Sequence, residues 1–146
     1  MQQTHILLII EDNPDDLELA LLALEETGLE DKIIIARDGI EAIDYLFAES
    51  RIQPLPDLVL LDLQLPRISG LEVLKKIRNN TRTRLLPIVI LTTSNEEIDR
   101  LKGYDLGCNS YVQKPVDYEQ FLHIIQQMTQ YWLGINSPPP YHHIMT

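Results

Sequence analysis

Five short apolar runs recur along the chain and alternate with segments of helical periodicity. The runs cover residues 5–10, 32–36, 57–61, 88–91 and 110–113. The first and third are apolar at both odd and even positions, which is typical of a strand covered on both faces. Apolar residues three or four apart predict helices over 14–27, 39–48, 71–78, 95–106 and 117–132. This alternation predicts an α/β fold in three layers, with five helices covering a five-stranded parallel sheet.

Capping residues mark several of the predicted helix ends. Asn13 can cap the first helix, and Pro14 suits its first position because the N–H that proline lacks needs no partner there. Asp38 and Glu41 have the spacing of a capping box at the second helix. Gly28 can end the first helix. These boundaries agree with the period of the apolar residues.

The size of the chain indicates one domain. It has 146 residues, of which 45% are hydrophobic and 23% charged, as in a globular protein with one core. We expect a domain over 1–133, followed by a proline-containing tail over 134–146. Three consecutive prolines at 138–140 prevent a helix from continuing into the tail. We therefore expect no DNA-binding output module.

Charge and cysteine content narrow the class of protein. The net charge of −10 at pH 7 argues against binding to nucleic acid, which depends on cations at the phosphates. This negative charge is compatible with basic protein partners or with cations. A contribution to solubility alone would explain it equally well. Cys108 is the single cysteine, so no disulfide can form within the chain and a reducing compartment is expected. Without a membrane-length apolar run or a secretory signal pattern, we expect a cytoplasmic protein that is not membrane-bound.

Charged residues follow three of the predicted strands. Glu11 and Asp12 follow the first, Asp62 the third, and Lys114 the fifth. The carboxyl ends of parallel strands meet at one edge of a sheet, where ligands bind. Carboxylates crowded together repel, so they need a divalent cation, a lysine or protonation. We therefore expect an acidic, metal-dependent pocket.

Asp62 is the candidate nucleophile of this pocket. An exposed carboxylate at a strand end can attack phosphorus and form an acyl phosphate. A divalent ion would shield the incoming phosphoryl group, and Mg²⁺ suits an all-oxygen site, where Mn²⁺ or Ca²⁺ can substitute. We expect Asp12 and Asp62 to bind the metal directly with the backbone carbonyl of Gln64, and Glu11 to bind it through water.

Two further residues can contact a phosphoryl group. Lys114 offers a compact positive charge, and Thr92, at the end of the fourth strand, offers a hydroxyl donor. Taken singly, these features are weak signals. A lone Lys-Pro is nearly uninformative, and a threonine or an acidic pair at a strand end is often only a helix cap. The specificity lies in the combination and its order along the chain.

That combination resembles the receiver domain of two-component response regulators. The resemblance covers about residues 5 to 132 and rests on Glu11-Asp12, Asp62 with Pro66 and Gly70, Thr92, and Lys114-Pro115. It implies a flavodoxin-like sheet in the order 2-1-3-4-5, phosphoryl transfer from a phosphohistidine to Asp62 with magnesium, and a cis peptide bond before Pro115. Such a protein assists its own phosphorylation and dephosphorylation but is not otherwise an enzyme.

The resemblance also implies a switch and partners. Thr92 would move toward the phosphoryl group and Tyr111 would turn inward, which would reshape the surface of the fourth helix, fifth strand and fifth helix. The ending Tyr131-Trp132-Leu133 and the loop at 55–57 look like the stand-alone regulators of cyanobacterial phytochromes. The implied partner is a phytochrome-type sensor histidine kinase, with an unknown downstream protein. We expect a homodimer through the same surface and the tail, the alternative being a tail folded back on its own domain.

Two other functions fit the same topology less well. An aspartyl-nucleophile phosphatase of the haloacid dehalogenase type needs a second acid two residues after the nucleophile, where this chain has Gln64. A flavin-binding electron carrier needs a phosphate-cradling loop after the first strand. That position holds Glu11, Asp12 and Asn13, which repel phosphate unless a cation intervenes.

Overall fold

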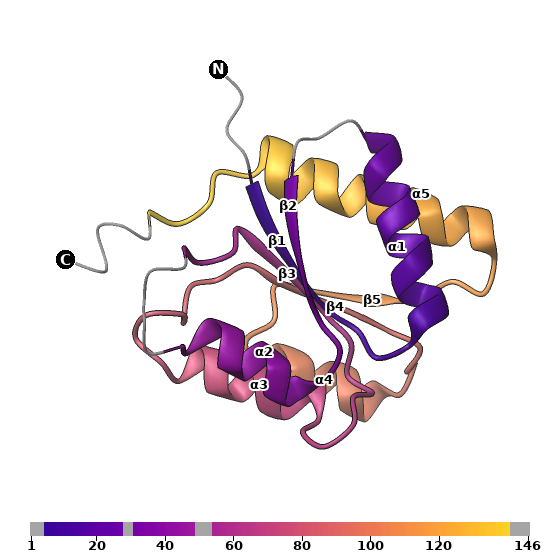
Figure 1. Ribbon diagram of the computed structural model, residues 1–146. Helices are drawn as coiled ribbons and strands as arrows, with labels where there is room; N and C mark the ends of the chain where they lie inside the picture. Colours follow the sequence, from indigo (N-terminus) through magenta and orange to yellow (C-terminus); the bar gives the residue numbers. More distant parts are fainter. Residues whose placement is uncertain (1–4, 28–30, 49–53, 141–146) are drawn as a thin grey trace.

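The computed structural model describes residues 5–27, 31–48 and 54–140, and all five predicted strands and helices lie within them (Figure 1). The strands are β1 His5–Ile10, β2 Asp31–Ala36, β3 Leu58–Leu61, β4 Ile88–Thr92 and β5 Ser110–Gln113. The helices are α1 Pro14–Thr27, α2 Gly39–Leu46, α3 Gly70–Arg78, α4 Glu97–Leu106 and α5 Tyr118–Thr129, followed by the π-helical segment η1 Gln130–Ile135. None of the helices in these ranges is long and apolar enough to cross a membrane.

The sheet is parallel throughout, and its order β2-β1-β3-β4-β5 confirms the predicted one. Its register aligns the strand ends that carry the charged residues. Ile10 at the end of β1 is paired with Leu61 at the end of β3. Backbone bonds continue one step beyond the strands, from Asp62 N to Ile10 O at 3.0 Å and from Lys114 N to Thr92 O at 2.7 Å. The residues after β1, β3 and β5 therefore leave the sheet at one edge.

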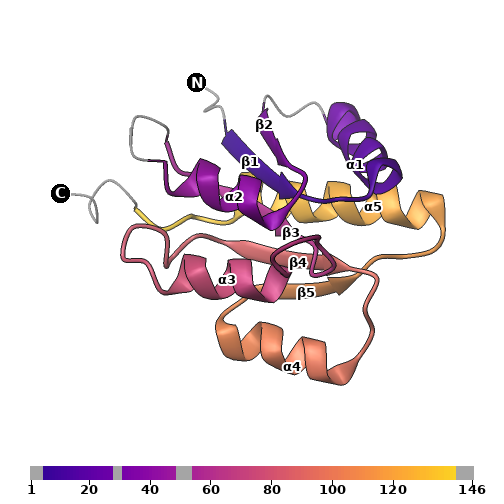
Figure 2. The same cartoon turned by 60° about the horizontal axis from the view of Figure 1, so that its bottom comes forward.

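Helices cover both faces of the sheet. α1 and α5 contact each other on one face, and α2, α3 and α4 form a row on the other (Figures 1 and 2). Alternate residues of β1 enter different cores: Leu7 and Ile9 pack toward α1 and α5, whereas Leu8 and Ile10 pack toward α2 and α3. All four are buried, as expected for a strand covered on both sides.

The helix starts predicted inside the described ranges are confirmed, except that the Glu41 side chain accepts from Arg37 N at 3.2 Å and not from Asp38 N as in a full capping box. Asn13 Oδ1 accepts hydrogen bonds from the backbone N–H groups of Asp15 and Asp16 at 2.9 and 3.1 Å. Asp38 Oδ1 accepts from Glu41 N at 2.8 Å at the start of α2. The predicted stop at Gly28 lies outside the described residues.

Two local predictions are wrong. The last helix was expected to end at Trp132, but helical turns continue through η1, where Asn136 N donates to Tyr131 O at 2.7 Å. The wider turn accommodates the buried side chain of Leu133, which packs in the core beside α1 and α5. The peptide bond before Pro115 is trans, as are all peptide bonds of the described residues. Trans is the lower-energy isomer even before proline, and Lys114 enters the site without the cis form.

Candidate functional site

The ammonium group of Lys114 lies at the centre of three carboxylates. Its Nζ is 2.6 Å from Glu11 Oε1, 2.9 Å from Asp16 Oδ2 and 2.9 Å from Asp62 Oδ2. The four side chains come from the ends of β5, β1 and β3 and from the first turn of α1. An ammonium has three N–H donors, so these three acceptors use all of them.

Burial strengthens the electrostatic interactions within this cluster. Glu11, Asp62 and Lys114 are each 5–6% exposed. Burial raises the pKa of Glu11 to about 7 from 4.5; hydrogen bonding to Lys114 opposes this rise and the charge of Asp62 adds to it. Burial alone would lower the pKa of Lys114, but the three carboxylates outweigh it and leave that pKa above its ordinary value. Lys114 therefore remains a cation at neutral pH, facing more negative charge than it can neutralise.

The structure brings together Glu11, Asp62 and Lys114, all three of which the sequence nominates. Asp16, which is not among the site residues that the sequence nominates, joins them. Its signal was available, because side chains in the first turn lean back toward the helix N-terminus. That direction carries the side chain of Asp16 toward the end of β1.

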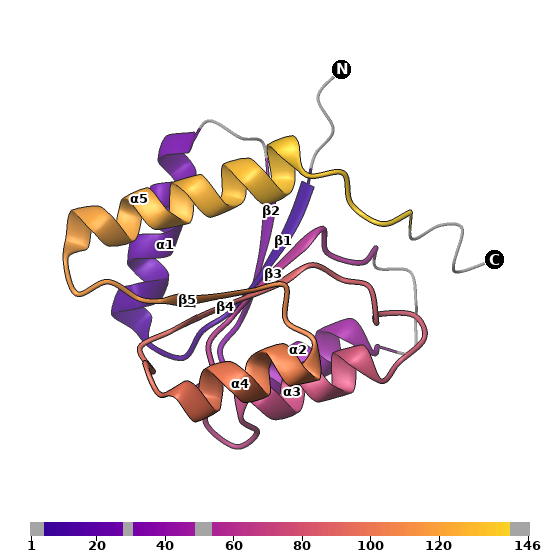
Figure 3. The same cartoon turned by 180° about the vertical axis from the view of Figure 1, so that it is seen from behind.

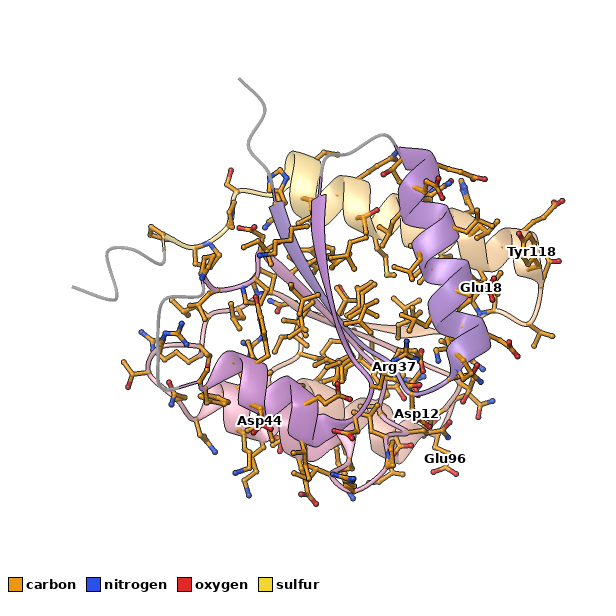
Figure 4. The ribbon with its side chains drawn as sticks, viewed as in Figure 1. Asp12, Glu18, Arg37, Asp44, Glu96 and Tyr118 are labelled. Atoms are coloured by element: carbon orange, nitrogen blue, oxygen red, sulfur yellow. The ribbon has the colours of Figure 1, made fainter. Side chains whose placement is uncertain are left out.

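Asp12 follows Glu11 in the segment between β1 and α1. Figure 4 shows Asp12 with Arg37 and Glu96 at the edge of the molecule where the strands end. Its side chain is exposed, whereas that of Glu11 is buried. The two neighbouring acids thus divide between solvent and interior, because successive residues at a strand end point in opposite directions.

The loop after β3 is fitted closely around Asp62. Asp62 Oδ1 accepts from Gln64 N at 3.1 Å, and the side-chain oxygen of Gln64 accepts from Thr93 Oγ1 at 2.7 Å. A Cβ at Gly70 would lie 2.2 Å from the backbone oxygen of Asp62, so only glycine fits there. The predicted turn ending at Gly70 therefore fixes the backbone of the candidate nucleophile.

Thr92 and Tyr111 connect the site with α4. Thr92 is buried, and its Oγ1 accepts from Ser94 N at 3.4 Å. The Tyr111 hydroxyl donates to Ser94 O at 3.1 Å, and Ser94 Oγ donates to Asp99 Oδ2 at 2.6 Å. Burial raises the pKa of the half-buried Tyr111. The segment after β4 is thus tied to both predicted switch residues and to the first turn of α4.

The oxygen-rich donor set fits a hard divalent cation such as Mg²⁺. Within the described ranges, no group of three or more His, Cys, Asp or Glu side chains is arranged to hold a metal ion. Instead, the Lys114 ammonium lies between the carboxylates and makes the contacts that a metal ion would make. Glu11 Oε1 and Asp62 Oδ2 nevertheless converge on one point, the Lys114 Nζ.

The raised pKa of Glu11 predicts a pH-dependent stability. An acid with a higher pKa in the folded chain binds more protons folded than unfolded, so its contribution is present below pH 4.5 and is lost as the pH rises through about 7. We expect urea unfolding in EDTA to show a fall in stability over this window, and Glu11→Gln to remove up to about 3 kcal/mol of it. The same fall in both proteins would assign it to other groups.

Comparison with known proteins relates this geometry to a family. The sequence profile described as response regulator receiver domain matches residues 7–126. Response regulator Rcp1 of Synechocystis sp. is 34% identical over 136 residues, which are 92% of this chain and 92% of Rcp1. The probable methanogenesis regulatory protein FilR2 of Methanothrix harundinacea is 40% identical over 139 residues, 94% of this chain and 90% of FilR2.

Solved structures agree with the sequence comparisons. The phosphorylated cyanobacterial phytochrome response regulator RcpA matches with a TM-score of 0.89 and 34% identity, over 94% of this chain and 99% of RcpA. The Mn²⁺-bound form of Rcp1 matches with a TM-score of 0.87 and 34% identity, over 92% of this chain and 99% of Rcp1. The parallel sheet, the acidic pocket at its carboxyl edge and these matches agree, and the chain belongs to the response regulator receiver domain family.

Proposed function

We propose that Asp62 accepts a phosphoryl group from a phosphohistidine of a sensor histidine kinase, in a reaction that requires Mg²⁺. The observation that carries this proposal is the convergence of Glu11 and Asp62 on the Lys114 ammonium at the carboxyl edge of the sheet. Family membership and the phosphorylated state of RcpA support it.

The chain's own residues can perform most of this transfer. A carboxylate oxygen of Asp62 forms a bond to phosphorus while the bond from phosphorus to the donor nitrogen breaks, and the electron pair of that bond stays on the imidazole. Lys114 can then exchange its contact with Asp62 for one with a phosphoryl oxygen. Thr92 can turn its hydroxyl to donate to another, since the hydroxyl is now only an acceptor of a long bond from Ser94 N.

The metal would be held by Asp12, Asp62 and the backbone carbonyl of Gln64, with Glu11 acting through water. A divalent ion supplies positive charge that screens the phosphoryl group from the surrounding carboxylates. The Mn²⁺-bound form of Rcp1 supports a divalent-ion site in a protein of this fold. The same pocket also fits self-catalysed loss of the phosphoryl group, without turnover of a separate substrate.

The test is direct phosphorylation with a small-molecule donor. The protein is incubated with Mg²⁺ and acetyl phosphate and its intact mass is measured. We expect a gain of one phosphoryl group that EDTA prevents. An unchanged mass in Mg²⁺, with acetyl phosphate still present at the end, would overturn the proposal.

The kinase partner is proposed to be of the phytochrome type, acting in the cytoplasm. Support comes from RcpA, a cyanobacterial phytochrome response regulator that matches nearly the whole chain. A phosphorylated cyanobacterial phytochrome kinase should transfer its phosphoryl group to this protein at least about tenfold faster than an unrelated histidine kinase does. Equal rates would remove the assignment of this partner while leaving Asp62 as acceptor.

Phosphorylation of Asp62 would change the surface formed by α4, β5 and α5, where partners would bind. Tyr111 and Ser94 link the pocket to α4. A shift of Thr92 would therefore move the first turn of α4. Figure 3 shows β5 at the edge of the sheet between α4 and α5. Exposed apolar side chains gather on α4, at Ile98, Leu101 and Tyr104. We propose that this surface, with the tail, forms a homodimer and meets the downstream protein.

We expect wild-type protein at tens of micromolar to sediment as a dimer and Leu101→Arg to sediment as a monomer. Leu101 is 66% exposed, so the substitution leaves the core intact and acts only on the surface. Leu22→Arg, on an exposed position of α1, is the matched control and should remain dimeric. Sedimentation velocity that shows only monomer for the wild type, phosphorylated or not, would exclude the dimer.

A further inference from the structure

Asp16 has no part in the phosphoryl transfer proposed above, although it contacts the residue at the centre of the site. Its Oδ2 lies 2.9 Å from Lys114 Nζ, as close as the Asp62 oxygen. Asp16 comes from a different layer of the fold, the first turn of α1. The preference for negative charge at a helix start explains an acid at position 16, but it does not explain why that acid contacts Lys114.

The proposed chemistry would remove the other two acceptors of Lys114. A divalent cation bound directly by Asp62, and by Glu11 through water, would compete with the ammonium for these two carboxylates. When the cation engages those carboxylates, the buried ammonium must find another acceptor, because an unpaired buried charge is strongly unfavourable. Asp16 is the carboxylate that neither the metal nor the phosphoryl group would use.

The small cavity beside the cluster offers no further side-chain acceptor. A cavity of about 10 Å³ adjoins the cluster, room for no more than about one water. Among the residues that line it, the polar side chains are those of Glu11, Asp16 and Asp62. The others are apolar and come from β1, α1, β3, β4 and α5.

Asp16 is also well placed to remain an acceptor. Its backbone N–H is held by Asn13 Oδ1 at 3.1 Å, which fixes the first turn of α1. Its side chain is 24% exposed, against 8% for Glu11 and 6% for Asp62. Its carboxylate can therefore contact water as well as the ammonium, whereas the two inner carboxylates are enclosed.

We propose that Asp16 is a positioning residue that acts through Lys114. It receives the ammonium when a divalent cation engages Glu11 and Asp62, and it holds the ammonium beside the phosphoryl group of modified Asp62. This role rests on the proposed function, since it concerns the same pocket. Asp16 thereby strengthens metal binding, because it gives the displaced Lys114 ammonium a partner.

The test is the Mg²⁺ affinity of matched variants, measured by titration calorimetry without any phosphoryl donor. Asp16→Asn removes the charge at the contact. Asp15→Asn makes the same change of net charge one residue away, on an exposed side chain of the same turn. We expect Asp16→Asn to raise the Mg²⁺ dissociation constant about tenfold and Asp15→Asn to raise it less than about threefold.

A second background separates positioning from simple attraction between Asp16 and the metal. With Lys114→Met there is no ammonium to receive, so Asp16→Asn should raise the dissociation constant no more than Asp15→Asn does in that background. An equal, tenfold effect of Asp16→Asn with and without Lys114 would overturn the proposal, because the carboxylate would then act on the metal alone. Absence of Mg²⁺ binding in every protein, wild type included, would instead count against the proposed function.

Lysine NMR gives an independent reading if Lys114→Met does not fold. In wild-type protein the Lys114 ammonium should stay protected from solvent exchange after Mg²⁺ is added. In Asp16→Asn that protection should be lost on addition of Mg²⁺ and kept without it. Protection that survives Mg²⁺ in Asp16→Asn would mean that another group receives the ammonium, and would overturn the role of Asp16.

Discussion

Asp62→Asn is expected to abolish the mass gain of one phosphoryl group in Mg²⁺ and acetyl phosphate. The amide oxygen is a far weaker nucleophile than a carboxylate oxygen, and the acyl phosphate cannot form on it. Asparagine has nearly the same shape, so its oxygen can still accept the hydrogen bond that Gln64 N makes with Asp62 Oδ1 at 3.1 Å. The loss should therefore reflect chemistry and not unfolding.

Asp44→Asn provides the matched control for Asp62→Asn. It makes the same chemical change at an exposed carboxylate of α2, outside the site, so labelling should persist. Circular dichroism should show that both variants are folded. Labelling of Asp62→Asn to the wild-type extent would mean that another residue is the acceptor.

Lys114→Ala should give the largest change in stability. Removal of the ammonium leaves the buried carboxylates of Glu11 and Asp62 without their shared partner. Breaking a buried ion pair in this way costs roughly 3–5 kcal/mol. We expect urea unfolding in EDTA at pH 7.5 to show a loss of this size, and Mg²⁺ to restore part of it by replacing the lost positive charge.

Lys102→Ala is the control for Lys114→Ala. It deletes the same charge from an exposed position on α4 and should change the free energy of unfolding by less than about 0.5 kcal/mol. Equal losses in the two variants would show that the buried cluster contributes nothing specific. In Mg²⁺ we expect Lys114→Ala still to accept a phosphoryl group but to associate with partners poorly. Normal phosphorylation-dependent association of this variant would exclude a signalling role for the lysine.

The fold could be predicted well because its signals are local. A buried parallel strand needs apolar residues on both faces, and the run at 5–10 has them. Helix starts need an acceptor for free N–H groups, which Asn13 and Asp38 supply within three residues. Once the elements and their parallel arrangement are known, the gathering of Glu11, Asp62 and Lys114 at one edge follows from the geometry of a sheet.

One error arose where long-range packing decides the outcome. The π-helical turn after α5 depends on the burial of Leu133 against a core built by distant strands. That packing is not encoded in the few residues on either side. The other error has a different origin: the cis bond before Pro115 was implied by the resemblance to receiver domains, and the bond is trans, the isomer of lower energy.

The sequence by itself determined that several carboxylates and one lysine meet at the carboxyl edge of a parallel sheet. The parallel arrangement follows from the alternation of strands and helices, and the strand order was implied by the resemblance to receiver domains. Only the tertiary structure decided which of them touch. Lys114 contacts Glu11 and Asp16 across 103 and 98 residues of chain, and Asp62 across 52. An ion pair depends on a few tenths of an ångström between side chains from different layers, and that distance is set by the packing of α1 onto the sheet and not by any pattern along the chain.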